Sequence, residues 1–297
     1  MGSYQEANAR ERLQQLFDPN SFEEFLPPSQ RVVSPHLGQL NAPVAFDDGV
    51  AVGRAKLGGI TVYTAAQEGG FMGGAVGEVH GAKLVGLLRR AVRDHVAAVV
   101  LLVESGGVRL HEANAGLIAV SEVMRALLDV RAAGIPVVVL VGGSNGAFGG
   151  MGIVSRCANV VVMSEEGRLA MSGPEVIETA SGVEEFDSRD RALVWRTNGG
   201  KHRYLMGDCQ RIVADDIAAF REAAREALAA LAGHQAELTL ETLEAEQQML
   251  DERITRFGAL PDPVDIWSAM HIADAANIPM LDVDSFIAAA GQHRLGV

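Results

Sequence analysis

Two glycine-rich segments, each placed directly after an apolar run, are the part of this sequence best suited to chemistry. Residues 104–111 (ESGGVRLH) follow the run 97–103, and residues 146–152 (GAFGGMG) follow the run 137–141. A buried strand that opens into a glycine turn and then a helix exposes backbone N–H groups, which stabilise negative charge. Two such turns side by side would hold a developing oxyanion. The pattern therefore predicts chemistry on the enolate of a thioester.

Glycine turns after strands also occur in nucleotide-binding proteins and hydrolases. The chain has no Gly-Lys-Ser/Thr triplet and no G-x-G-x-x-G motif, which argues against both nucleotide-binding folds. Residues 142–146 match the G-x-S-x-G elbow of α/β-hydrolases, and Asp187 or Asp190 and His202 follow in the required order. The helix signal does not begin directly after Ser144, as that elbow requires. A loop serine is therefore favoured over a serine nucleophile.

Histidines and charged residues near the turns leave two alternatives open. His80, His111 and His202 lack the i, i+4 spacing of a helical metal pair, so no metal site is expected. His111, beside the first turn, is either structural or a direct participant in catalysis. Arg109 and Glu112 flank the same turn, where they form a salt bridge that stiffens it or contact the substrate.

A basic stretch at residues 189–211 contrasts with the acidic chain, whose net charge is −13. Trp195, Tyr204 and the pair Gly199-Gly200 lie among its charges, an arrangement that suits a docking surface better than a plain helix face. Its alternative is a solvated face. The basic side chains are Arg189, Arg191, Arg196, Lys201, Arg203 and Arg211, opposed by Asp190 and Asp208.

Composition narrows the class of protein. The chain has 297 residues, of which 48% are hydrophobic and 5% aromatic, and it contains two cysteines. Its apolar runs are shorter than the roughly 20 residues of a membrane span, and the polar start gives no secretory signal. We therefore expect a cytoplasmic enzyme subunit. Its negative charge argues against nucleic acid and anionic membrane as partners.

The apolar periodicity predicts one α/β core with a helical C-terminal extension. The alternation of strands and helices from residue 97 predicts parallel pairing with right-handed crossovers. Hairpins are expected at 44–54, turning on Asp48-Gly49, and at 56–66, turning on Gly58-Gly59. The expected helices are 9–17, 75–94, 112–133, 148–157, 215–232, 236–256, 263–276 and 282–290, and the expected strands are 97–103, 136–142, 160–163 and 168–171. The expected divisions are an N-terminal helix and linker (1–43), the core (44–214) and a helical extension of the same domain (215–297).

In the glycine-rich segments the chain resembles carboxyltransferase β-type subunits, which have the crotonase-like fold, a β-β-α superhelix. The shared segments are 48–53 (DGVAVG), 73–78 (GGAVGE), 105–109 (SGGVR) and 149–151 (GGM). More narrowly, it resembles the β subunits of biotin-independent malonate decarboxylase. That resemblance is carried by 106–116 (GGVRLHEANAG), 172–179 (SGPEVIET) and 184–203 (EEFDSRDRALVWRTNGGKHR), within a match that runs from about residue 8 to 210.

The resemblance implies a heteromeric complex. Malonate would be carried as a thioester on an acyl carrier protein, through a phosphopantetheine-type arm loaded by a transferase α subunit. This β chain and a γ subunit would then release CO₂ and leave the acetyl thioester. No covalently bound cofactor, biotin or metal is implied for this chain. A subunit of a biotin-dependent carboxylase or decarboxylase, and a non-catalytic scaffold for the carrier, remain as alternatives.

Two departures from related families bear on the chemistry. Bacterial acetyl-CoA carboxyltransferase β subunits carry a four-cysteine zinc ribbon near the N-terminus, whereas this chain has no cysteine before Cys157. Crotonase-type hydratases place a glutamate acid/base where this sequence has Ile153. Decarboxylation needs no base there, because loss of CO₂ itself generates the enolate.

Under this interpretation the main chain of four glycines is the catalytic machinery. The amides of Gly107 and Gly150 are the expected oxyanion donors, supported by Gly106 and Gly149. Glycine suits these positions because a Cβ would obstruct the thioester, or because φ is positive. Substrate or carrier binding is assigned to Gly73, Gly74, Arg109, Arg189, Arg191, Arg196, Lys201 and Arg203.

Overall fold

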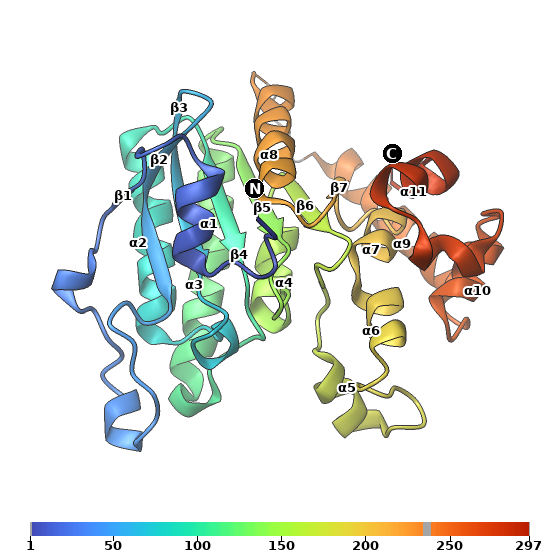
Figure 1. Cartoon of the computed structure of the whole chain (residues 1–297), viewed down its shortest axis with the longest axis horizontal. Coiled ribbons are helices and arrows are strands. Elements are labelled where there is room, and N and C mark those ends of the chain that lie inside the picture. Colours follow the sequence, from blue (N-terminus) through green and yellow to red (C-terminus); the bar gives the residue numbers. More distant parts are fainter. Residues whose placement is uncertain (1, 234–238, 297) are drawn as a thin grey trace.

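The computed structural model describes residues 2–233 and 239–296, and its centre is one sheet whose strands follow one another in chain order (Figure 1). Strands β1 to β3 pair antiparallel, and β3 to β7 pair parallel. The strands are β1 (Glu23–Glu24), β2 (Val50–Leu57), β3 (Ile60–Gln67), β4 (Val99–Val103), β5 (Val137–Val141), β6 (Val160–Ser164) and β7 (Arg211–Val213). The predicted crotonase-like α/β architecture is confirmed by this order and by the comparisons given below.

The central parallel strands are continuous apolar runs, without the alternation of apolar and polar residues that marks a strand with one exposed face. Every residue of β4 and β5 is buried, as expected for strands covered on both faces. Helices α2 (Glu78–Asp94), α3 (Asn114–Ala132) and α4 (Gly149–Arg156) pack on one face. They are the connections β3 to β4, β4 to β5 and β5 to β6, so the first three parallel pairs are each joined by a helix on the same side.

Two helices from opposite ends of the chain cover the other face. Helix α1 (Ala9–Leu16) begins at a capping box, in which the Asn8 side chain accepts the Glu11 amide and the Glu11 side chain accepts the Asn8 amide. Helix α8 (Ile217–Leu231) lies beside it, and both bury their apolar residues against β2 to β6 (Figure 1). The first helix of the predicted C-terminal extension therefore belongs to the helical layer that covers this face of the sheet.

A third apolar cluster lies beyond β7. It contains Trp267, Phe286 and Phe257 from the C-terminal region, together with Leu205 and Ile212 from the segment around β7. The helices of this part are α5 (Pro174–Ser181), α6 (Arg191–Asn198), α7 (Gly200–Leu205), α9 (Leu240–Phe257), α10 (Pro263–Ala269) and α11 (Val283–Ala290). No helix among the described residues is both long and apolar enough to cross a membrane.

Several local predictions differ from the structure. The hairpin on Asp48-Gly49 is wrong: both residues have positive φ and lead into β2, which pairs with β3 through the confirmed Gly58-Gly59 turn. The strand at 168–171 is also wrong, because that segment makes only isolated bridges. The helix predicted at 263–276 ends at Ala269. Residues 236–238 of the helix predicted at 236–256 lie outside the described residues, and that helix begins at Leu240.

Candidate active site

The two glycine turns lie side by side at the carboxyl ends of β4 and β5. The Ser105 amide donates to the Gly146 carbonyl at 2.7 Å, and the Phe148 amide donates to the Ser105 carbonyl at 2.8 Å. A Cβ built on Gly149 would lie 3.2 Å from the Cα of Gly107. Main-chain hydrogen bonds thus fix the turns relative to each other, in the arrangement that the sequence predicts.

The second turn presents a free donor at the N-terminus of α4. The Gly149 amide donates to the Met171 carbonyl at 2.9 Å, whereas the Gly150 amide has no hydrogen-bond partner among the described residues. Gly149 has a φ of +56°, which an L side chain rarely adopts. A Cβ on Gly150 would lie 2.4 Å from Cγ1 of Val120 in α3, so close helix packing demands glycine there.

The first turn differs from the expectation. The Gly106 amide donates to the Gly73 carbonyl at 2.8 Å, and the Gly107 amide donates to the Ser105 hydroxyl oxygen at 3.2 Å. Both predicted groups of this turn are therefore occupied, although the bond from Gly107 is long. The sequence could not show this, because the acceptor for Gly106 lies in a distant segment and the bond from Gly107 depends on the rotamer of Ser105.

Gly73 and Gly74 lie against the backbone of the first turn. Their φ angles are +64° and +69°. A Cβ on Gly74 would lie 1.9 Å from the carbonyl oxygen of Glu104. These glycines, predicted to bind the substrate or its carrier, lie directly against the backbone of residues 104–106.

Arg109 is a buried cation, as the salt-bridge alternative requires. Its side chain has 0% exposure, and Nη1 lies 3.0 Å from both carboxylate oxygens of Asp48. Nη1 also lies 3.5 Å from Glu112, and Nη2 donates to the Asp48 and Ala75 carbonyls. The assignment of Arg109 to substrate binding is not supported, because its charge is used inside the protein.

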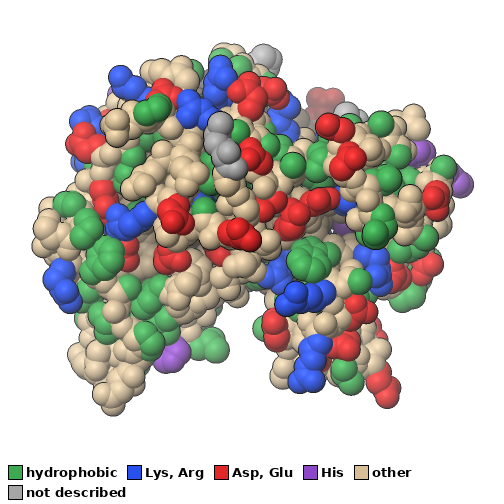
Figure 2. All heavy atoms as spheres, viewed as in Figure 1, with side chains coloured by type: hydrophobic (Ala, Val, Ile, Leu, Met, Phe, Trp, Pro, Cys, Tyr) green, Lys and Arg blue, Asp and Glu red, His purple; other side chains and the backbone are tan. Residues whose placement is uncertain are grey.

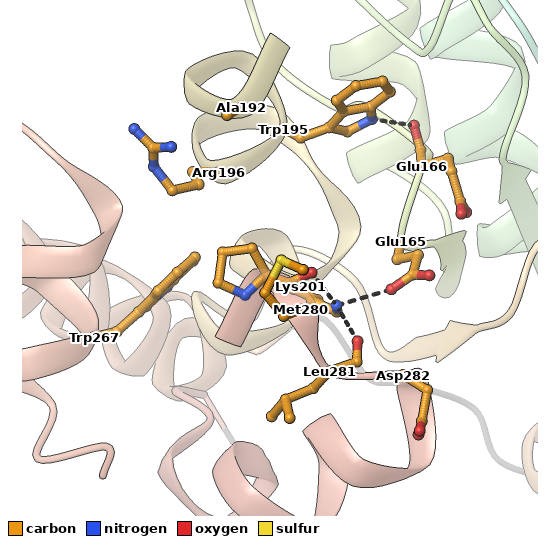
Figure 3. A pocket seen from close by; sticks show the side chains of 11 residues that line it. Glu165, Glu166, Ala192, Trp195, Arg196, Lys201, Trp267, Met280, Leu281 and Asp282 are labelled. Atoms are coloured by element: carbon orange, nitrogen blue, oxygen red, sulfur yellow. Dashed lines mark hydrogen bonds and ion pairs between the residues drawn. The ribbon is translucent and has the colours of Figure 1, made fainter. Parts of the chain in front are cut away.

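The basic stretch does not form one cationic surface. Arg196 pairs with Asp262 at 2.9 Å, and Arg203 pairs with Asp208 at 3.0 Å. Lys201 is buried, lies 2.8 Å from Glu165 and donates to carbonyls of residues 279 and 281 (Figure 3). Arg196 and Lys201 thereby link α6 and α7 to the C-terminal region, whereas Arg203 bonds within its own segment, to Asp208. Of the five predicted docking residues, Arg189 and Arg191 are exposed.

A pocket of about 580 Å³ lies next to Lys201, between α6 and the segment that precedes α11 (Figure 3). The indole N–H of Trp195 donates to the Glu166 carbonyl at 3.2 Å on one wall, and Trp267 and Met280 line the other. The hydrogen bonds and ion pairs of Lys201 and Arg196 are satisfied within the protein. Within the part of the chain that the structure describes, the pocket therefore carries no cation free for a phosphate.

Among the described residues, no histidine is hydrogen-bonded to Ser144. Its hydroxyl donates to Glu104 at 3.2 Å, while His202 accepts the indole N–H of Trp267 at 3.3 Å. Within residues 2–233 and 239–296 there is no group of three or more His, Cys, Asp or Glu side chains that could hold a metal. The hydrolase alternative therefore lacks a base within the part of the chain that the structure describes.

His80 and His202 are buried neutral imidazoles. His202 accepts a hydrogen bond through Nδ1, and His80 lies between Gln67 at 2.9 Å and the Asp48 carbonyl at 3.1 Å. Burial, together with a smaller effect of neighbouring Arg109 or Arg203, lowers the pKa of each to about 3. Neither histidine is a proton donor near neutral pH.

We expect these histidines to make stability depend on pH. Between pH 6.5 and about pH 3, both histidines are protonated in the unfolded chain but remain neutral in the folded chain. Stability is therefore lost as pH falls, by about 1.4 kcal/mol per pH unit for each histidine. Urea unfolding at pH 7.5 and 5.5 measures the loss, and His202→Gln should reduce it by about half, since one of the two groups is gone. An equal loss in the variant would contradict this assignment.

Apolar side chains are exposed around the second turn. Leu110 is 87% exposed and Met171 65% exposed, and the carbonyl of Met171 bonds to Gly149. Leu117 and Ile118 on the first turn of α3 and Val176 on α5 are also exposed. Figure 2 shows the hollow between the body of the molecule and the projecting part that carries α5 and α6. These exposed residues and the hollow leave the site open to solvent in the isolated chain.

Comparison with known proteins agrees with this geometry. The family model described as the carboxyl transferase domain matches residues 5–266. The malonyl-S-ACP:biotin-protein carboxyltransferase MADC of Malonomonas rubra is 44% identical over 234 residues, covering 74% of this chain and 73% of its own. A chain of the Pseudomonas malonate decarboxylase hetero-tetramer, solved in complex with malonate, is 38% identical with a TM-score of 0.80, covering 89% of this chain and 95% of its own.

The chain therefore belongs to the carboxyl transferase family. Within it, the chain is also similar to a chain of the Pseudomonas malonate decarboxylase hetero-dimer, at 35% identity and a TM-score of 0.66, covering 84% of this chain and 96% of its own. The resemblance to malonate decarboxylase subunits that the sequence suggests is confirmed by these similarities.

Proposed function

We propose that this chain is the β-type subunit of a malonate decarboxylase and that it stabilises the enolate formed when a malonyl thioester loses CO₂. The observation that carries the proposal is the Gly150 amide at the N-terminus of α4, which has no partner among the described residues and lies beside the turn at residues 105–107. Similarity over nearly the whole length of a Pseudomonas malonate decarboxylase chain supports the substrate class.

In the reaction, the bond between the carboxylate carbon and the α-carbon breaks. Its electron pair forms the enolate, whose negative charge lies largely on the thioester oxygen. The Gly150 N–H and the positive end of α4 would stabilise that oxygen, in a position fixed before the reaction begins. Gly107 would contribute a second donor by exchanging its long bond to Ser105 for the oxyanion. A proton then converts the enolate into the acetyl thioester.

No side chain is needed at the position of the hydratase glutamate. Ile153 occupies it, on the partly exposed side of α4. Because decarboxylation itself supplies the electron pair, the absence of a carboxylate there fits loss of CO₂ and does not fit hydration.

The malonyl group would arrive on the phosphopantetheine-type arm of an acyl carrier protein, loaded by an α transferase subunit. A γ subunit would cover the exposed apolar residues Leu110, Leu117, Ile118, Met171 and Val176 and complete the site. Exposed apolar patches of this kind commonly mark protein interfaces. The hetero-dimer and hetero-tetramer described for the Pseudomonas enzyme support such an assembly.

A second candidate is transfer of the carboxyl group to a biotin protein, the acceptor that the name of the Malonomonas rubra relative specifies. Both reactions pass through the same enolate and would use the same donors. They differ in whether the carboxyl carbon leaves as CO₂ or is transferred to biotin.

An assay with carboxyl-labelled malonyl carrier protein separates these functions. The chain with its γ partner should release labelled CO₂ and leave acetyl thioester, and added avidin should not inhibit. Either subunit alone should be inactive or nearly so. Inhibition by avidin with label recovered on biotin would favour the second candidate. No turnover of the thioester, with or without avidin, would contradict both candidates.

For carrier docking we expect a modest contribution from Arg189 and Arg191, the two exposed members of the basic stretch. Replacing both by alanine should raise KM for the malonyl carrier protein about threefold, since each exposed ion pair contributes less than about 1 kcal/mol. The value of kcat should not change, because the contacts are equal in ground and transition states. The effect should shrink at high salt.

The matched control replaces Arg89 and Arg93, whose side chains are 61% and 71% exposed on α2. It should leave KM unaltered, as should the double variant of Arg189 and Arg191 when the substrate is malonyl-pantetheine without the carrier. An unchanged KM for the carrier substrate would exclude these two arginines from docking.

A further inference from the structure

Glu104 is a buried carboxylate at the end of a wholly apolar strand. It follows β4 directly and is 4% exposed. One of its oxygens accepts from the Ser144 hydroxyl at 3.2 Å, the Asn145 amide at 3.2 Å and the Asn145 side chain at 3.1 Å. The other oxygen pairs with the guanidinium of Arg12. A charge is buried without large cost only when its oxygens are satisfied in this way.

Arg12 is held as firmly as its partner. It lies on α1, is 1% exposed and donates through Nε to the Tyr4 carbonyl at 2.8 Å and through Nη2 to the Gln5 carbonyl at 3.3 Å. Its guanidinium carbon lies 4.6 Å from the centre of the Tyr4 ring. The N-terminal segment thus reaches across the sheet edge to the ends of β4 and β5.

Glycines of two loops are packed against Glu104 without room for a side chain. A Cβ on Gly143 would lie 2.3 Å from its Cδ, and a Cβ on Gly69 would lie 2.3 Å from Oε1. A Cβ on Gly74 would meet its backbone carbonyl. The loops 69–74, 104–107 and 142–146 therefore meet at this one residue.

From this arrangement we propose that Glu104 is a positioning residue that sets the direction of the Gly150 amide. Its carboxylate fixes residues 144 and 145 against the end of β4. The hydrogen bonds of Ser105 with Gly146 and Phe148 then fix the chain between residue 145 and the start of α4, which sets the position of that helix N-terminus. The inference rests on the proposed function, because it concerns the oxyanion donor of that reaction.

A carboxylate is required rather than an amide of equal shape. All four of the hydrogen-bonding partners are donors, and a glutamine would turn an NH₂ group toward either Arg12 or residues 144 and 145. A donor facing a donor would displace the turn. Geometry errors of about 1 Å at a reacting centre cost up to roughly a hundredfold in rate.

The test compares Glu104→Gln with Asp18→Asn in the complex with the γ subunit. Asp18 pairs with Arg221 and accepts the Gly58 and Gly59 amides, so it is a carboxylate with the same kinds of partner, in a more exposed ion pair remote from the two turns. Glu104→Gln should lower kcat by about tenfold to a hundredfold, while KM changes by less than about threefold. Asp18→Asn should retain kcat even where it lowers the unfolding temperature.

Hydrogen–deuterium exchange gives a readout that does not depend on turnover. The peptide covering residues 143–152 should exchange faster in Glu104→Gln than in the wild type or in Asp18→Asn. If Glu104→Gln does not fold, Asn145→Ala removes one donor to Oε1 and should show the same changes at a smaller size. Wild-type kcat, or unchanged exchange in this peptide, in a folded variant would overturn the role of Glu104.

The same measurements distinguish the two proposals. A wild-type complex that fails to convert malonyl thioester contradicts the proposed function, while the exchange of residues 143–152 still decides whether Glu104 holds the turn. Turnover that is equal in wild type and Glu104→Gln contradicts only the role of Glu104.

Discussion

Proline at position 150 should lower kcat for decarboxylation by about 10²–10³-fold, the usual effect of removing one oxyanion donor. Proline has no N–H, and its φ fits the first turn of a helix such as α4. Any Cβ at this position would collide with Val120, at 2.4 Å from its Cγ1. The comparison is therefore made in a Val120→Ala background.

In that background Gly150→Ala is the matched control. It adds a Cβ as proline does but keeps the N–H, so its kcat should stay within about tenfold of the parent, whereas proline should not. Circular dichroism establishes that both variants fold, and association with the γ subunit is measured for both. Equal activity of folded proline and alanine variants would remove Gly150 from the oxyanion site.

Replacing Arg109 by methionine should lower the free energy of unfolding by about 3–5 kcal/mol, because one partner of a buried pair is removed. Asp48 would keep its carboxylate in a site that is 0% exposed. Burial already raises the pKa of Asp48 above its usual value, and Arg109 acts in the opposite direction. Glu112, 3.5 Å from the same nitrogen, would lose its cation too.

Urea unfolding of the isolated chain measures this loss. Arg211→Met is the control: it breaks an ion pair with Glu226 that is exposed on both sides and should cost less than about 1 kcal/mol. A stable Arg109→Met variant with a raised KM would instead support the alternative in which this arginine contacts substrate.

The order of the core could be predicted from local sequence. The runs at β4 and β5 are apolar at every position, which indicates strands buried on both faces, and the amphipathic segments between them indicate covering helices. Parallel strands must end at the same edge of a sheet, so the two glycine turns had to meet. Each step depends on neighbouring residues alone.

The partners of the charged groups could not be predicted in this way. Asp48-Gly49 has the composition of a hairpin turn, yet Asp48 pairs with Arg109, 61 residues further along the chain. The basic stretch looks continuous, but Arg196 and Lys201 are neutralised by Asp262 and Glu165 from other segments. Glu104 carries one local signal, a carboxylate closing an apolar run, and nothing near it in sequence identifies Arg12.

The sequence by itself thus determined the strands, the covering helices and the two glycine turns, because hydrophobic periodicity and glycine conformation act over a few residues. The tertiary structure decided which amide is free and which charges are exposed. The Gly107 amide donates to the Ser105 hydroxyl, the Gly150 amide has no partner within residues 2–233 and 239–296, and Arg12 pairs with Glu104, 92 residues further along the chain. A hydrogen bond or ion pair depends on distances of a few ångströms, which only the packed chain defines.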